Sequence, residues 1–197
     1  MFKELLSKLG QGLAARDIPY MVIGGQAVLL YGEPRLTRDI DITLGIGREA
    51  LSAILNLCQS LFLKPLPGSI EAFVEKTMVL PALDEKTGIK VDFIFSYTPY
   101  ERKAIHRAKK VLLNEIPVNF AAPEDVIIHK IFAHRPRDLE DVRIILLKNP
   151  DLDHDYIRKW LTDFEAANPD ESLMRFFEDL LKGIHESHEY GGNRPPI

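Results

Sequence analysis

The sequence predicts an α/β (α+β) fold, with a mixed β-sheet flanked by helices and followed by a C-terminal helical segment. Three observations support this. Short apolar stretches bounded by Gly, Pro and Asp alternate with longer amphipathic ones through residue 121. The stretch DIDITLGI alternates polar and apolar residues with the period of two that is typical of a strand. Beyond residue 122 only helical periodicity remains.

Length and composition limit the class of protein. A chain of 197 residues, 46% of them hydrophobic, is long enough to bury one core, or one core with an additional helical segment. The net charge of -4 does not provide the strongly basic footprint expected for duplex nucleic acid. The single cysteine, Cys58, excludes an intrachain disulfide and fits a reducing cytoplasm. Because we find neither a signal peptide nor an apolar run of about 20 residues, we expect a cytoplasmic protein without membrane contacts.

The first half of the chain alternates helices and strands. Residues 2–16 place their apolar side chains on one helical face, and IPYMVIGG reads as a buried strand that ends at two glycines. KPLPGS, at residues 64–69, is a break. The expected elements are a helix over residues 2–16, a strand over 18–25, a short helix over 26–32, a strand over 39–46 and a helix over 48–62.

The middle of the chain looks strand-like and the end helical. DEKTG is a turn signal between two apolar stretches, which predicts an antiparallel hairpin. The expected elements are strands over 72–83 and 89–96, a basic helix over 100–110, a small hairpin over 111–121, and helices over 123–134, 137–148, 153–167 and 170–188 before a loose tail. We therefore expect a core over residues 1–121, a helical segment over 122–190 packed on it, and a flexible tail over 191–197.

The stretch VIGGQAVLLYGEPRLTRDIDI combines two glycines with two aspartates. On a strand, Asp39 and Asp41 share one face while Ile40 and Ile42 point into the core. Two adjacent carboxylates repel each other unless a positive charge intervenes, and they form a hard oxygen site suited to Mg²⁺.

The two glycines at the end of the first strand suggest a phosphate cradle. Gly24 and Gly25 allow a tight turn and a close approach to a ligand, and the following helix directs free N–H groups outward. The alternative is a purely structural turn beside a solvated strand edge, with the aspartates exposed to water.

The order of these residues, namely an apolar residue, two glycines, thirteen residues and Asp-apolar-Asp-apolar, resembles the signature of the polymerase-β nucleotidyltransferase superfamily. The resemblance implies a nucleotidyltransferase core that moves a nucleoside monophosphate from an NTP such as ATP to an acceptor, with two Mg²⁺ ions. It also implies a third carboxylate on a later strand, for which Asp92 in VDFIF is the candidate. Asp39, Asp41 and Asp92 would then be the catalytic and metal-binding residues. Alternatively, Asp92 is simply the polar member of an alternating strand.

The loop before the acidic strand extends this resemblance. RLTRDIDI is similar to the Arg-x-Thr-x-Asp-apolar-Asp form of minimal and toxin-like nucleotidyltransferases. The similarity implies nucleotide contacts from Arg35 and Thr37, since a guanidinium matches phosphate oxygens bidentately. Alternatively, Arg35 and Arg38 neutralise the nearby acids as ion pairs.

A second stretch, PEDVIIHKIFAHRPRDLEDVRIIL, resembles the Lys…Arg-x-Arg-Asp-x-x-Asp segment of the abortive-infection type nucleotidyltransferase toxins and their uncharacterised relatives. The resemblance implies that Lys130 contacts the triphosphate and that Asp138 or Asp141 completes the site. The sequence does not distinguish the two aspartates. As alternatives, Asp138 caps a helix, Asp141 forms a surface ion pair and Lys130 is solvated.

The resemblance leaves the acceptor open among a tRNA, a protein hydroxyl and a small molecule. It makes a toxin of a toxin–antitoxin pair conceivable, with an antitoxin as partner. The basic stretch at residues 100–110 is either a solvated face or a contact for an RNA acceptor. The competing hypothesis is a catalytically inactive member that serves as a nucleotide- or partner-binding module. The presence of all three carboxylates favours the enzyme.

Overall fold

The computed structural model describes residues 1–34, 36–96, 98–168 and 172–191, and side chains in the last helix are described through residue 184 and at residue 186. Contacts within the chain define two compact units. Unit 1 comprises Met1–Leu29 and Arg35–Ala122, and unit 2 comprises Leu30–Pro34 and Pro123–Ile197. None of the described helices is long and apolar enough to cross a membrane.

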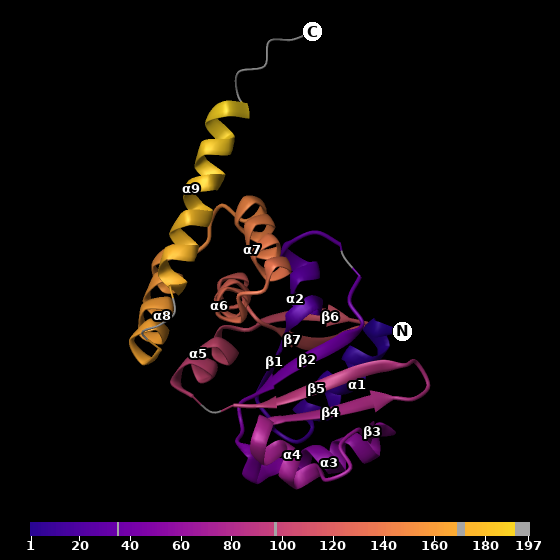
Figure 1. Cartoon of the computed structure of the whole chain (residues 1–197). Coiled ribbons are helices and arrows are strands. Elements are labelled where there is room, and N and C mark those ends of the chain that lie inside the picture. Colours follow the sequence, from indigo (N-terminus) through magenta and orange to yellow (C-terminus); the bar gives the residue numbers. More distant parts are fainter. Residues whose placement is uncertain (35, 97, 169–171, 192–197) are drawn as a thin grey trace. The chain divides into compact units, whose positions relative to one another are not determined.

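Unit 1 is built on one mixed sheet, as the sequence predicts (Figure 1). The strand order is β3-β4-β5-β2-β1-β7-β6 among the described residues. The pairs β2–β5 and β1–β7 are parallel and the other pairs are antiparallel. The strands are β1 (Tyr20–Ile23), β2 (Asp39–Leu44), β3 (Leu63–Pro65), β4 (Val79–Asp84), β5 (Ile89–Phe95), β6 (Lys109–Leu113) and β7 (Ile116–Phe120).

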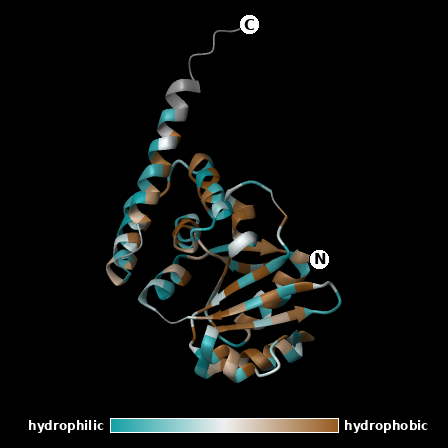
Figure 2. Ribbon diagram, viewed as in Figure 1, coloured by the Kyte–Doolittle hydropathy of each residue, from teal (hydrophilic) through white to brown (hydrophobic). Residues whose placement is uncertain are grey.

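The helices of this part of the chain cover the sheet with apolar side chains. They are α1 (Phe2–Ala14), α2 (Gly24–Tyr31), a short 3-10 turn η1 (Arg48–Ala50), α3 (Leu51–Ser60), α4 (Ile70–Thr77) and α5 (Pro99–Arg107). Helix α1 packs against β6 and β7, α3 against β3, and α4 against β4. Alternate residues of β2 and β5 are fully buried in the core, and Figure 2 shows the mixture of hydrophobic and hydrophilic residues along the strands. This core leaves the polar residues of β2 and β5 on the opposite face of the sheet.

Three local predictions are wrong. The stretch over residues 72–83, expected to be a strand, is the end of α4 and then β4; the helix ends at Thr77 and is followed by Met78, whose φ is 57°. The expected break at residues 64–69 contains part of β3, which pairs with β4. The basic helix ends at Arg107, so Lys109 and Lys110 belong to β6.

In the described part of unit 2, four helices follow β7. They are α6 (Pro123–Ala133), α7 (Pro136–Lys148), α8 (His154–Ala167) and α9 (Leu173–Gly191). Their fully buried apolar residues are Ile127, Ile128, Ile131, Val142, Ile145, Ile157, Leu161 and Phe177. Because α9 continues through Gly191, the expectation of a loose tail is wrong for residues 189–191, and residues 192–197 lie outside the described part of the chain.

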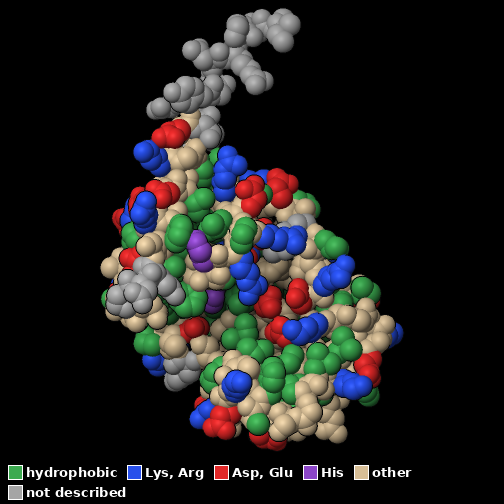
Figure 3. Space-filling view, viewed as in Figure 1, with side chains coloured by type: hydrophobic (Ala, Val, Ile, Leu, Met, Phe, Trp, Pro, Cys, Tyr) green, Lys and Arg blue, Asp and Glu red, His purple; other side chains and the backbone are tan. Residues whose placement is uncertain are grey.

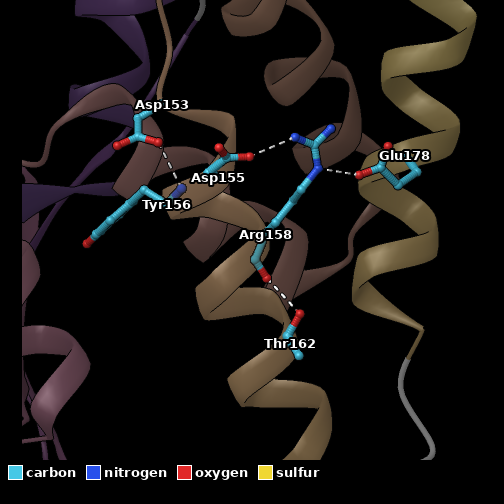
Figure 4. Close-up of polar contacts among 6 residues, drawn as sticks. All are labelled: Asp153, Asp155, Tyr156, Arg158, Thr162 and Glu178. Carbon is cyan, nitrogen blue, oxygen red and sulfur yellow. Dashed lines mark hydrogen bonds and ion pairs between the residues drawn. The ribbon is translucent and has the colours of Figure 1, made fainter.

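One polar contact caps the beginning of α8, and another joins α8 to α9 (Figure 4). Asp153 caps α8 by accepting a hydrogen bond from the backbone N–H of Tyr156 at 2.9 Å. Arg158 of α8 donates from Nε to Glu178 of α9 at 2.8 Å. Since both of these side chains are 40% or more exposed, the pair orients the helices and adds little stability.

The chain segment Leu30–Pro34 belongs to unit 2 through hydrogen bonds to the end of α7. Asn149 donates from Nδ2 to the carbonyl oxygen of Tyr31 at 3.0 Å. Lys148 donates to the carbonyl oxygen of Gly32 at 3.1 Å and forms an ion pair with Glu33. The end of α2 is therefore held by the helical unit, while its beginning lies in unit 1.

Candidate active site

The turn from β1 into α2 brings the backbone directly against a carboxylate. Gly24 begins α2 with a φ of +62°, a conformation that L residues rarely adopt. A Cβ at this position would overlap Oδ2 of Asp41 and lie 2.9 Å from its Cγ. Gly25 follows as a buried residue of the helix. The helix thus starts two residues earlier than the sequence predicts, and its first N–H groups lie at the end of β1.

The two aspartates of β2 lie as the alternating pattern predicts. Ile40 and Ile42 are fully buried, whereas Asp39 and Asp41 are half-buried on the other face. Thr37 donates weakly from its hydroxyl to Oδ1 of Asp39 at 3.4 Å. Thr37 is thus next to the carboxylate, and its proposed contact with the nucleotide stays a prediction. Arg35 lies outside the described residues.

The third carboxylate lies beside the pair. Strands β2 and β5 are parallel, and the Cα of Asp92 is the ladder partner of the Cα of Asp41. Neighbouring strands are about 4.8 Å apart, so these two side chains are direct neighbours on one face. The same register places Lys90 opposite Asp39. In Figure 3, acidic side chains gather over β2 and β5 with cationic side chains beside them.

Lys90 belongs to this cluster and was not predicted from the sequence. Its Nζ lies 2.8 Å from Oδ2 of Asp92. The other oxygen of that carboxylate, Oδ1, is buried and accepts no hydrogen bond from the described residues. The signal was available in the sequence IKVDF, because residues two apart on a strand share a face.

The donor set fits Mg²⁺ in one specific way. Among the described residues, no group of three or more His, Cys, Asp or Glu side chains is arranged to hold a metal ion. Mg²⁺, however, is commonly bound by one or two carboxylates together with waters and substrate phosphates. Asp39 and Asp41 supply two such carboxylates on one face, and the unsatisfied Oδ1 of Asp92 lies one strand away. The chemistry of these groups therefore suits a magnesium ion that arrives with a triphosphate.

Unit 2 contains a cluster of charged side chains around a buried lysine. The Lys130 side chain is only 7% exposed, and its ammonium forms ion pairs with Asp138 and, at 2.8 Å, with Asp141. The structural alternatives inferred from the sequence are wrong for all three residues. Arg135, not Asp138, is the N-cap of α7. Asp141 and Lys130 are buried instead of lying at the surface.

Burial also affects the residue next to Lys130. His129 is fully buried in the helical unit, and this burial lowers the pKa of its imidazole to about 4. The imidazole is therefore neutral at physiological pH. Whether Lys130 and Asp138 contact a nucleotide stays a prediction from the sequence.

Comparison with known proteins identifies the kind of domain. Residues 13–187 match the model of a family described as nucleotidyl transferase AbiEii toxin, type IV toxin–antitoxin system. No curated protein sequence matches the chain.

Solved structures share the fold at low sequence identity. An antigenic nucleotidyltransferase-like protein from Paracoccidioides brasiliensis is 18% identical, with a TM-score of 0.55 over 88% of this chain and 91% of the other. The structure of ANT(2'')-Ia in complex with adenylyl-2''-tobramycin is 16% identical, with a TM-score of 0.57 over 84% of this chain and 98% of the other. At such identities these likenesses establish the fold.

Proposed function

Because the chain belongs to the AbiEii family of nucleotidyl transferase toxins, we propose that it transfers a nucleoside monophosphate from an NTP to an acceptor in a Mg²⁺-dependent reaction. The observation that carries the proposal is the register of β2 and β5, which makes Asp41 and Asp92 direct neighbours next to the Gly24 turn. Bound Mg²⁺ would neutralise the charge that develops on the phosphates.

The proposal assigns roles to the three carboxylates and to the glycine turn. Asp39 and Asp41 hold Mg²⁺, and the N–H groups after Gly24 and Gly25 receive the phosphates. Asp92 accepts the proton of the acceptor hydroxyl and also contributes to the metal site. The acceptor oxygen forms a bond to the α-phosphorus, the bond from that phosphorus to the bridging oxygen breaks, and pyrophosphate leaves.

Further nucleotide contacts rest on the family resemblance. We assign Arg35 and Thr37 to the phosphates because they precede the acidic strand within the RLTRDIDI motif. On the same ground Lys130 is assigned to the triphosphate, and Asp138 is assigned to the site as the group that orients this lysine. Ion pairs with Asp138 and Asp141 fix the position of the Lys130 ammonium.

The family description supports a biological role as the toxin of a type IV toxin–antitoxin system. We propose that an antitoxin acts as its partner, that the acceptor is a tRNA, a protein or a small molecule, and that the protein works in the cytoplasm. Incubation of the purified chain with each labelled NTP and a cell extract, followed by separation of RNA, protein and small molecules, identifies the acceptor. Label in none of these fractions, with any NTP, contradicts the transferase proposal.

A binding experiment separates a chain that binds Mg²⁺ and NTP from an inactive module that binds only a partner. Mg²⁺ with the correct NTP at 100 times its Kd stabilises the folded chain by about 2.7 kcal/mol. Asp41→Asn should abolish this stabilisation, because it removes a carboxylate from the metal site. Asp163→Asn is the matched control, since Asp163 forms an exposed ion pair with Lys159 on α8. Equal stabilisation of both variants contradicts the assigned metal site.

A further inference from the structure

Lys90 introduces a positive charge into a cluster of three carboxylates. It lies two residues before Asp92 on β5 and opposite Asp39 in the ladder. Its ammonium contacts one oxygen of Asp92 at 2.8 Å, and the side chains of Lys90 and Asp92 are 44% and 17% exposed. The lysine is therefore open to solvent while its partner is mostly covered.

Both partners in this ion pair keep unused hydrogen-bonding capacity. An ammonium has three N–H donors, and the hydrogen bond to Asp92 is the only one that Lys90 makes with described residues. On the other partner, Oδ1 of Asp92 is buried and has no donor among the described residues. A buried carboxylate oxygen without a partner is rare and indicates a missing cation or donor. The pair can thus accept a cation on the carboxylate side and an anion on the ammonium side.

We propose that Lys90 is a positioning residue that makes divalent-cation binding depend on the triphosphate, an inference that rests on the proposed function. A bare divalent cation is repelled by the ammonium and competes with it for Asp92. A magnesium–triphosphate complex is a net anion, so the same ammonium attracts it. Lys90 therefore favours the metal that arrives with substrate over the metal alone.

The size of the effect follows from Coulomb's law. The interaction energy between a single and a double charge roughly 6 Å apart, in a dielectric close to that of water, changes a binding affinity about tenfold. Removal of the ammonium should strengthen the binding of a bare divalent cation about tenfold. It should weaken the binding of the magnesium–triphosphate complex by about the same factor. A purely structural ion pair would shift both affinities in one direction, through stability alone.

The test measures two affinities for each of four full-length proteins by calorimetry. The probes are Mn²⁺ alone and inorganic triphosphate with saturating Mg²⁺, and the proteins are wild type, Lys90→Met, Lys90→Arg and Lys64→Met. Lys64 is the matched control, because it forms an exposed ion pair with Glu85 at 2.9 Å on β3 of the same sheet. We expect opposite shifts only in Lys90→Met and recovery of both affinities in Lys90→Arg.

The outcomes separate this inference from the proposed function. If wild type binds both probes and Lys90→Met shifts both affinities in the same direction, or neither, the role of Lys90 is wrong and the proposed function stands. If wild type binds neither probe, both proposals are wrong. If Lys90→Met does not fold, Lys90→Gln takes its place, because it also removes the charge while keeping a polar side chain; the same opposite shifts are expected, and their absence contradicts the role of Lys90.

Discussion

Replacement of Gly24 by alanine tests the geometry of the candidate site most directly. Two features demand glycine at this position: a φ of +62° and the close approach of the Asp41 carboxylate. An alanine methyl group overlaps Oδ2 of Asp41, and even Cγ is only 2.9 Å away. The carboxylate must therefore rotate out of its position, or the turn must open.

A second glycine separates the backbone effect from the steric one. Gly88, in the β4–β5 turn, has a φ of +71°, and a Cβ added there would meet no atom within 4 Å. Left-handed backbone costs an alanine about 1–2 kcal/mol, so Gly88→Ala should lose this amount. Gly24→Ala should lose about 1 kcal/mol more, because Asp41 is forced off its rotamer. In a chain of this size, each kcal/mol lowers Tm by about 2–4 °C.

The two variants should differ far more in function than in stability. Displacement of a catalytic group by about 1 Å can reduce the rate about 100-fold, so Gly24→Ala should lose most transfer activity. It should also lose stabilisation by Mg²⁺ with NTP, whereas Gly88→Ala should keep both. Urea denaturation measures the stability difference, and labelled-NTP transfer with a thermal shift measures the function. If Gly24→Ala retains the nucleotide response of Gly88→Ala, the contact between the turn and Asp41 has no role in the site.

Three further predictions concern buried groups. Burial lowers the pKa of His129 to about 4, so between pH 6.5 and 4 the unfolded chain binds a proton more readily than the folded one. The free energy of unfolding should therefore fall by about 3 kcal/mol over this range. Urea denaturation should show a smaller change of this free energy with pH in His129→Gln. Lys130→Met should lower the free energy of unfolding, measured by urea denaturation, by about 3–5 kcal/mol, because two buried carboxylates lose their cation. Lys182→Met, at an exposed ion pair, should change this free energy little. Burial raises the pKa of the Cys58 thiol to about 12, so a thiol reagent should label it only when the chain unfolds.

Strand and helix types were predictable where periodicity is strong. The alternation of DIDITL fixes β2, and Ile40 and Ile42 are buried as that pattern requires. The failure over residues 72–83 has a physical cause. The run AFVEKTMVLPAL contains the end of a helix and most of a strand, and both carry enough apolar residues to look continuous. Their junction depends on Met78 in a left-handed conformation, which its side chain does not favour.

The candidate site was predictable from the sequence where neighbouring residues of one strand create it, and not where it depends on contacts between elements. Local spacing places Asp39 and Asp41 on one face, but the position of Asp92 depends on which strands pair and in which register. The ion pair of Lys90 follows from the i, i+2 spacing alone and could have been inferred. The burial of Lys130 depends on the packing of α6 and α7, which no pattern within a single helix specifies.

The register that creates the cluster is itself fixed by the apolar residues between the acids. In the parallel pair, Ile40 lies opposite Val91 and Ile42 opposite Phe93, and all four side chains are fully buried. A shift of β2 by one residue along β5 would place an acid opposite an apolar core residue. It would also turn either the acids into the core or the isoleucines out of it. The cost of burying an unpaired carboxylate opposes every such alternative. The neighbouring positions of Asp41 and Asp92 are therefore enforced by the hydrophobic core beneath them.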